Sequence, residues 1–213
     1  PYAVPRAALD EVLGALRGAA GPEPGRRALR VAAWKPLATG LVMTRAVDTA
    51  ATVLNKMREA VAGRLEPLGA SLQREEIVPH DAAAVADALL RMARSADAPQ
   101  LLLVSGIAAT VDRRDVVPAA MELAGGRVVH AGMPVDPGNL LVLGELPGAA
   151  APVPVVGIPT CARSPKLNGF DFVLRRLVAG EPVTPAAIMA MGVGGLLTEI
   201  ESRPMPRDPR RGG

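Results

Sequence analysis

The feature that most constrains this chain is a short, unbroken apolar run, Leu101-Leu102-Leu103-Val104, which ends at Ser105-Gly106. Such a run is expected of a strand buried on both faces of a parallel sheet, because that strand has no solvent-facing side. Further strand patterns alternate with amphipathic helical patterns along the chain. The sequence therefore predicts an α/β layered fold with a mostly parallel sheet.

The individual elements follow from periodicity and from Gly and Pro punctuation. Helical patterns cover residues 6–17, 49–65, 81–94, 116–124, 167–178 and 185–191. Strand patterns cover residues 29–34, 40–44, 71–78, 100–104, 127–130, 140–145 and 153–158. Asp48 or Thr49 is expected to cap the second helix, and Asp81 the third.

Three regions are predicted from these patterns. Residues 1–26 form an N-terminal helical arm and linker, residues 27–202 form the main domain, and residues 203–213 form a flexible tail. The chain begins at Pro1 without a methionine, which leaves open a fragment or a processed form.

The charge balance argues against a nucleic-acid partner. The formal net charge is +3, and the arginine-rich tail 203–213 accounts for all of it, so that residues 1–202 are neutral. Aromatic residues make up only 2% of the chain, too few for a base-stacking platform. We expect no nucleic acid among the partners.

The remaining composition predicts a cytoplasmic protein. Cys161 is the single cysteine, so no internal disulfide forms and a reducing compartment fits. The 22 Gly and 21 Pro interrupt every apolar stretch before it reaches the roughly 20 residues of a membrane-spanning helix. There is no signal-peptide pattern, and one Cys with two His make a zinc site improbable. We expect no membrane partner and no metal held by the protein's own side chains.

Three polar loops follow predicted strands: Ser105–Asp115, Pro134–Asn139 and Pro159–Asn168. Open α/β sheets bind ligands beyond the carboxyl ends of their strands, so we expect these loops to build one pocket.

The first loop has two interpretations. Arg113, Arg114 and Asp115 are either a solvated cluster that caps the next helix or part of an anion site. In the anion site, small residues let backbone N–H groups approach a phosphate and Thr110 adds a hydroxyl. Asp115 would then hold a metal ion or orient a nucleophile.

The third loop is also open to two interpretations. Ser164 or Asn168 is either only a helix cap, with Pro165 near the first turn, or part of an anion site with Lys166. Cys161 is expected to be a buried or loop-lining thiol rather than a nucleophile, because neither histidine lies near it in the sequence.

At these loops the chain resembles the molybdopterin-binding domain family over roughly residues 38–200. The resemblance is carried by Ser105-Gly106, by Asp112-Arg113-Arg114-Asp115-Val116-Val117-Pro118, by Pro137-Gly138, and by Gly157-Ile158-Pro159 with Ser164-Pro165-Lys166. The longer runs Gly132–Leu140 and Cys161–Asp171 are similar to a bacterial branch whose members are sometimes fused to a nucleotidyltransferase.

The resemblance implies a three-layer α/β/α sandwich that holds molybdopterin or molybdenum cofactor. Relatives adenylylate molybdopterin with MgATP or insert molybdate, and they assemble as homo-oligomers. It implies Asp115 as the catalytic residue that acts with the metal–nucleotide. The residues expected to line the ligand, from the loops and the resemblance together, are Ser105, Gly106, Thr110, Asp112, Arg113, Arg114, Pro137, Gly138, Asn139, Pro159, Thr160, Cys161, Ser164, Lys166 and Asn168.

The chain departs from the family pattern in ways that bear on catalysis. Relatives carry Gly-Gly-Thr-Gly where Ser105-Gly106-Ile107-Ala108 stand, an acidic residue at His80, and glycine at Thr160. Three functions therefore remain open. The chain is a cofactor-binding domain in molybdenum cofactor biosynthesis, an Mg-dependent adenylyl- or molybdenumtransferase, or a non-catalytic carrier for a fused nucleotidyltransferase or a molybdoenzyme partner.

Overall fold

A computed structural model of the chain describes residues 6–20, 31–148 and 151–192. The chain divides into two compact units, Pro1–Ala33 and Trp34–Gly213. In the first unit, helix α1 (Arg6–Ala20) carries an ion pair between Arg6 and Asp10, one turn apart. The predicted linker at 21–25 and the tail 203–213 lie outside the described residues.

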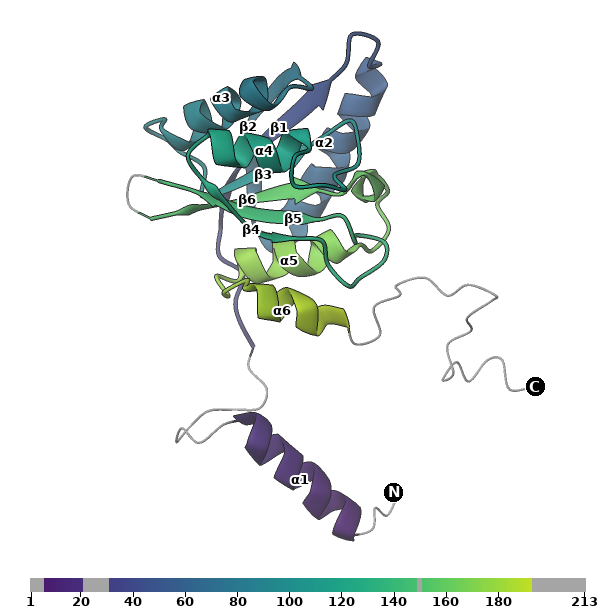
Figure 1. Ribbon diagram of the computed structural model, residues 1–213. Helices are drawn as coiled ribbons and strands as arrows, with labels where there is room; N and C mark the ends of the chain where they lie inside the picture. The colour runs from purple at the N-terminus through teal and green to yellow at the C-terminus, as the bar shows by residue number, and fades with distance from the viewer. Residues whose placement is uncertain (1–5, 21–30, 149–150, 193–213) are drawn as a thin grey trace, which may run out of the picture. The chain divides into compact units, whose positions relative to one another are not determined.

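The second unit is built on a six-stranded sheet (Figure 1). Its strands stand in the order β2-β1-β3-β6-β5-β4. Their bounds are β1 (Ala38–Arg45), β2 (Ser71–Pro79), β3 (Leu101–Ser105), β4 (Arg127–Ala131), β5 (Val142–Leu146) and β6 (Val153–Ile158).

Only β5 runs against the other strands. The pairs β2–β1, β1–β3 and β3–β6 are parallel. Two successive antiparallel pairings, β6–β5 and β5–β4, bring β4 back to the direction of β6. The carboxyl ends of β3, β4 and β6 therefore meet at the same edge of the sheet, and the predicted mostly parallel sheet is confirmed.

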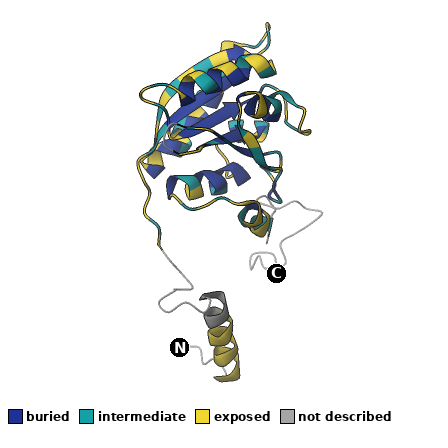
Figure 2. Ribbon diagram, turned by 60° about the vertical axis from the view of Figure 1, so that its left-hand side comes forward, coloured by how far each residue is buried: buried dark blue, intermediate teal, exposed yellow. Residues whose placement is uncertain are grey.

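Helices cover both faces of the sheet. One face packs against α2 (Ala51–Leu65), α5 (Gly169–Val178) and α6 (Pro185–Met189), and the other against α3 (Ala82–Ala93) and α4 (Val116–Leu123). Along β3, Leu101 and Leu103 face the first layer, whereas Leu102 and Val104 face the second. This two-sided burial, visible as the dark interior in Figure 2, explains the unbroken apolar run and confirms a three-layer α/β/α sandwich.

Some local predictions are confirmed and others are wrong. Asp81 caps α3 by accepting a hydrogen bond from the Ala84 N–H. The predicted cap of α2 is wrong: the Thr49 hydroxyl accepts from the Ala46 N–H in the preceding turn, and Ala50 stands at the N-cap without a side-chain bond.

The predicted strand at 29–34 is also wrong where the structure describes it. Residues 31–34 form no strand, and Val31 is 99% exposed. These residues pair with neither edge strand of the sheet, β2 or β4. Near the start of the second unit, the Lys35 N–H donates instead to the Val178 carbonyl.

No helix in the described ranges has both the length and the apolar character needed to cross a bilayer.

Candidate functional site

The three predicted loops lie together at the carboxyl edge of the sheet. The Arg163 guanidinium, in the third loop, donates to the carbonyl oxygens of Ile107 at 3.2 Å and Gly106 at 3.4 Å, in the first. The second loop contacts the start of α5, directly after the third loop, where the Gly169 N–H donates to the Pro137 carbonyl at 2.8 Å. These hydrogen bonds hold the three loops in one assembly.

The first loop begins inside the protein and ends at its surface. Ser105 and Gly106 are buried at the end of β3, whereas Asp112, Arg113 and Arg114 are exposed. The Arg114 guanidinium approaches the Asp112 carboxylate only to 3.8 Å, and such an exposed ion pair contributes little to stability. The Arg113 side chain has no hydrogen bond or ion pair with any described residue. The two arginines are therefore available to a ligand.

Two small cavities flank the first loop. One of about 180 Å³ is lined by Thr110, Arg114 and Asp115 together with His80. The other, of about 150 Å³, lies between residues 110–113 and the β4–β5 hairpin. Thr110 lines both cavities.

Asp115 stands at the N-cap of α4 but does not cap the helix through its side chain. Its carboxylate Oδ2 accepts from the N–H groups of Asp112 at 2.9 Å and Val111 at 2.7 Å. The predicted helix-capping alternative is therefore wrong for this residue, because the carboxylate turns back to close the loop. These two hydrogen bonds lower the pKa of Asp115 below its ordinary value, and the bond from the Asp112 N–H has the larger effect. The nearby charge of His80 lowers this pKa by a smaller amount.

The second loop is shaped by Gly138. Its φ of +128° lies in a region that favours glycine, and a Cβ there would lie 2.5 Å from the backbone nitrogen of Gly169. Gly138 is buried, whereas Asn139 is exposed and accepts a bond from the Met133 N–H through its carbonyl oxygen. The fold thus needs Gly138 and Pro137 at the contact with the third loop, and leaves the Asn139 side chain free to face a ligand.

The third loop starts from buried Pro159 and continues through a short helix, η2 (Thr160–Arg163). Cys161 is exposed, and its Sγ accepts from the Asn168 Nδ2 at 3.2 Å. Ser164 and Lys166 are exposed, and the Ser164 hydroxyl oxygen accepts from the Lys166 N–H. The Lys166 ammonium has no partner among the described residues, so its charge is available.

Asn168 is the N-cap of α5. Its side chain accepts from the Phe170 N–H, and Asp171 returns a bond to the Asn168 N–H, which completes a capping box. The sequence pattern predicts that this helix begins at Leu167, but the capping box makes it begin at Gly169. Of the two predicted caps, Asn168 is the one observed, and its buried side chain serves the fold.

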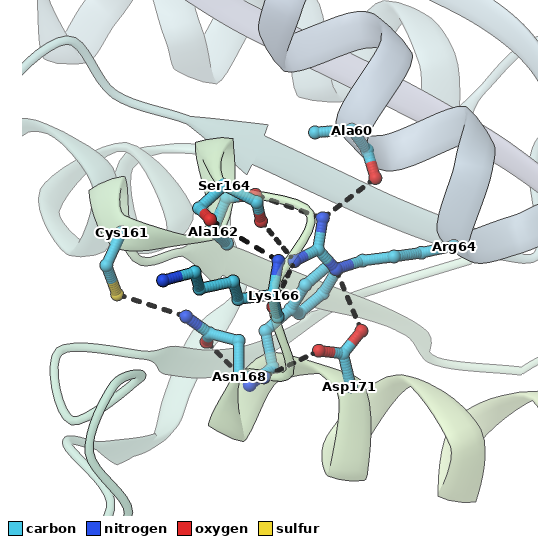
Figure 3. Close-up of polar contacts among 9 residues, drawn as sticks. Ala60, Arg64, Cys161, Ala162, Ser164, Lys166, Asn168 and Asp171 are labelled. Carbon is cyan, nitrogen blue, oxygen red and sulfur yellow. Dashed lines mark hydrogen bonds and ion pairs between the residues drawn. The ribbon is translucent and has the colours of Figure 1, made fainter. Parts of the chain in front are cut away.

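Sequence reasoning missed Arg64, the last basic residue of α2 (Figure 3). Its Nε donates to Asp171 at 2.8 Å, and its side chain is only 9% exposed. Its terminal nitrogens donate to the carbonyl oxygens of Ala60, Ala162, Ser164 and Lys166. The third loop is therefore fixed by an arginine about a hundred positions earlier, and no local motif signals it.

A second missed residue is Thr44, near the end of β1. Its buried hydroxyl oxygen accepts from the Ile107 N–H at 2.9 Å and lies 2.9 Å from the Nδ1 of His80. Strand β1, the segment after β2 and the first loop thus meet at this hydroxyl.

The described residues contain no group of three or more His, Cys, Asp or Glu side chains arranged to hold a metal ion.

The fold and the loop arrangement define an α/β/α domain of the class that binds ligands beyond the carboxyl ends of parallel strands. The chain belongs to the family described as probable molybdopterin binding domain, whose model matches residues 37–191. It is thus a member of a molybdenum cofactor biosynthesis domain family.

Comparison with solved structures finds the crystal structure of molybdenum cofactor biosynthesis protein B. The alignment covers 68% of this chain and 93% of that one, with 16% sequence identity and a TM-score of 0.45. No protein of curated function matches the sequence significantly.

Proposed function

We propose that this chain binds molybdopterin or molybdenum cofactor during cofactor biosynthesis. One observation carries the proposal: the three loops that follow β3, β4 and β6 are joined at one edge of the sheet by the Arg163 and Gly169 contacts. This assembly falls within the matched family region, residues 37–191.

The charges of the loops support an anionic ligand. Arg113 and Lys166 have no partner among the described side chains, and both are exposed. Molybdopterin carries a phosphate, which such cations bind through charge-assisted hydrogen bonds.

The backbone N–H groups at the start of α5 contribute less to anion binding than their position after the third loop predicts. The N–H groups of Gly169, Phe170 and Asp171 are engaged by Pro137, by the Asn168 side chain and by the Asn168 carbonyl. The first N–H groups of a helix bind an anion only while they lack partners. Anion binding at the third loop therefore depends on Lys166 and Ser164.

Mass spectrometry of small molecules retained by the purified protein tests the proposal. We expect a phosphorylated pterin, with or without molybdenum, in the parent protein, and the same compound on reconstitution with molybdopterin. A protein that carries no pterin and fails to retain added molybdopterin would contradict the proposal.

A second candidate is an Mg-dependent adenylyl- or molybdenumtransferase. Asp115 favours it, because its lowered pKa keeps the carboxylate ionised and Oδ1 has no partner among the described residues. A magnesium ion at Oδ1 would take its other ligands from phosphate and water, since no further acidic cluster surrounds it in the described ranges.

Turnover of ATP in the presence of molybdopterin separates this enzyme from a carrier. The enzyme consumes ATP and releases pyrophosphate, whereas a carrier binds the pterin without turnover. The homo-oligomer expected from the resemblance stays a prediction, which light scattering measures.

A further inference from the structure

His80 follows β2 directly and lies beside the first loop. Its backbone N–H donates to the Arg45 carbonyl at 3.0 Å, which fixes the start of the segment between β2 and α3. His80 lines the cavity of about 180 Å³ together with residues of the first loop. The loop pattern gives this histidine no role, and it stands where relatives carry an acidic residue.

The Thr44 hydroxyl decides which nitrogen of His80 carries the proton. The Thr44 oxygen already accepts from the Ile107 N–H. Its single hydrogen has the His80 Nδ1, at 2.9 Å, as its acceptor, and no other acceptor for it is found among the described residues. In the neutral imidazole, Nδ1 therefore accepts and Nε2 carries the hydrogen.

The same cavity is rich in donors. Ala108, Ala109 and Thr110 line it, and their backbone N–H groups have no hydrogen-bond partner in the described part of the chain. Arg114 adds a guanidinium that makes only a long, exposed contact with Asp112. The one acid there, Asp115, has its Oδ2 occupied by two backbone N–H groups.

We propose that this cavity is an oxyanion site of the phosphate class, with the His80 Nε2–H as a fixed donor whose tautomer is set by Thr44. The inference rests on the proposed function, because it takes the first loop as part of the ligand site. It deepens that function by adding His80, as a donor of fixed tautomer, to the anion site expected at the first loop.

The tautomer is measured by ¹⁵N NMR of the full chain, above the ordinary imidazole pKa of about 6.5. The chain has two histidines, so the His80 signals are assigned by their loss in His80→Gln, and His130 on β4 serves as an internal reference. We expect the Nε2–H tautomer at His80, and Thr44→Val should convert it to a mixture. A protonated Nδ1 in the neutral ring would overturn the inference.

The ligand class is measured by adding inorganic phosphate or pyrophosphate. We expect the His80 Nε2 resonance to move and that of His130 to stay. His80→Gln places an amide N–H near the position of Nε2–H and should bind within about threefold of the parent. His80→Asn places its amide near Nδ1 and should lose about tenfold. Thermal unfolding of both variants confirms that they are folded.

The outcomes separate this inference from the proposed function. Phosphate that moves His80 in a protein that retains no molybdopterin supports the oxyanion site and contradicts the proposed function. A protein that retains molybdopterin while phosphate leaves His80 unmoved, or while the two His80 variants bind phosphate equally, overturns the inference alone.

Discussion

The Arg64 guanidinium lies 2.8 Å from the Asp171 carboxylate, although 107 residues separate them in the chain. The pair joins the end of α2 to the first turn of α5. The same guanidinium holds the carbonyl oxygens of Ser164 and Lys166, so one side chain sets the path of the third loop. The exposed side chains of that loop owe their positions to a buried contact on another element.

Arg64→Met should destabilise the protein by about 3 kcal/mol, because it leaves the Asp171 carboxylate and three loop carbonyls without their donor in a largely buried place. Arg58→Met is the matched control on the same helix. Its ion pair with Glu75 is about one-third exposed and screened by solvent, so that variant should lose far less stability than Arg64→Met. Urea unfolding measures both, and equal losses would contradict the assigned role of Arg64.

Lys166→Met should weaken molybdopterin binding by about 1 kcal/mol or more, the scale of one charge-assisted hydrogen bond, with little change in Tm. The ammonium has no partner among the described residues, so the fold does not depend on it. Lys35→Met is the control, because it removes the same charge beside Val178 at the other end of α5. Titration calorimetry measures both affinities, and unchanged affinity in Lys166→Met would remove this loop from the anion site.

Gly138→Ala should separate the second loop from the third. Its new Cβ would meet the backbone of Gly169 and the Asn168 side chain at a φ that disfavours alanine. We expect a loss of about 2 kcal/mol in the free energy of unfolding. Gly63→Ala, on the exposed side of α2 with no atom within 4 Å, should instead stabilise by up to about 1 kcal/mol. A tolerated alanine at 138 would show that the loops are not held together there.

Asp115→Asn should keep the loop closed, because an amide oxygen can still accept from the N–H groups of Asp112 and Val111. It removes the charge, so Mg-dependent nucleotide binding should be lost if the chain is a transferase. Binding of magnesium–nucleotide equal to that of the parent would contradict the role assigned to this carboxylate.

The pH dependence of stability gives Asp115 a second test. Its pKa is lowered in the folded protein by the N–H groups of Asp112 and Val111. The ionised carboxylate therefore stabilises the fold above its unfolded pKa of about 3.9, and this contribution disappears as the pH falls through the lower folded value. The parent should lose more stability than Asp115→Asn on acidification, which thermal unfolding across that pH range measures.

Local chemistry was enough to predict much of the framework. The apolar run 101–104 can be satisfied only between two layers of helices, and β3 lies there. Asp81 caps α3 because an Asn, Asp, Ser or Thr side chain bonds the N–H groups two or three residues ahead, which is a contact within one turn. The position of the three loops also follows, since the carboxyl ends of parallel strands share an edge.

The sequence by itself therefore determined the layers, the direction of most strands and the edge at which the loops meet. Only the tertiary structure decided which polar groups are engaged within that edge. The sequence pattern alone predicts a solvated helix residue at Arg64, whereas in the fold its guanidinium binds the third loop. The pattern likewise predicts only a strand residue at Thr44, whereas in the fold its hydroxyl contacts both His80 and Ile107. The reason is physical: periodicity is a property of neighbouring residues, whereas a buried hydrogen bond is satisfied by whichever partner packing brings within about 3 Å.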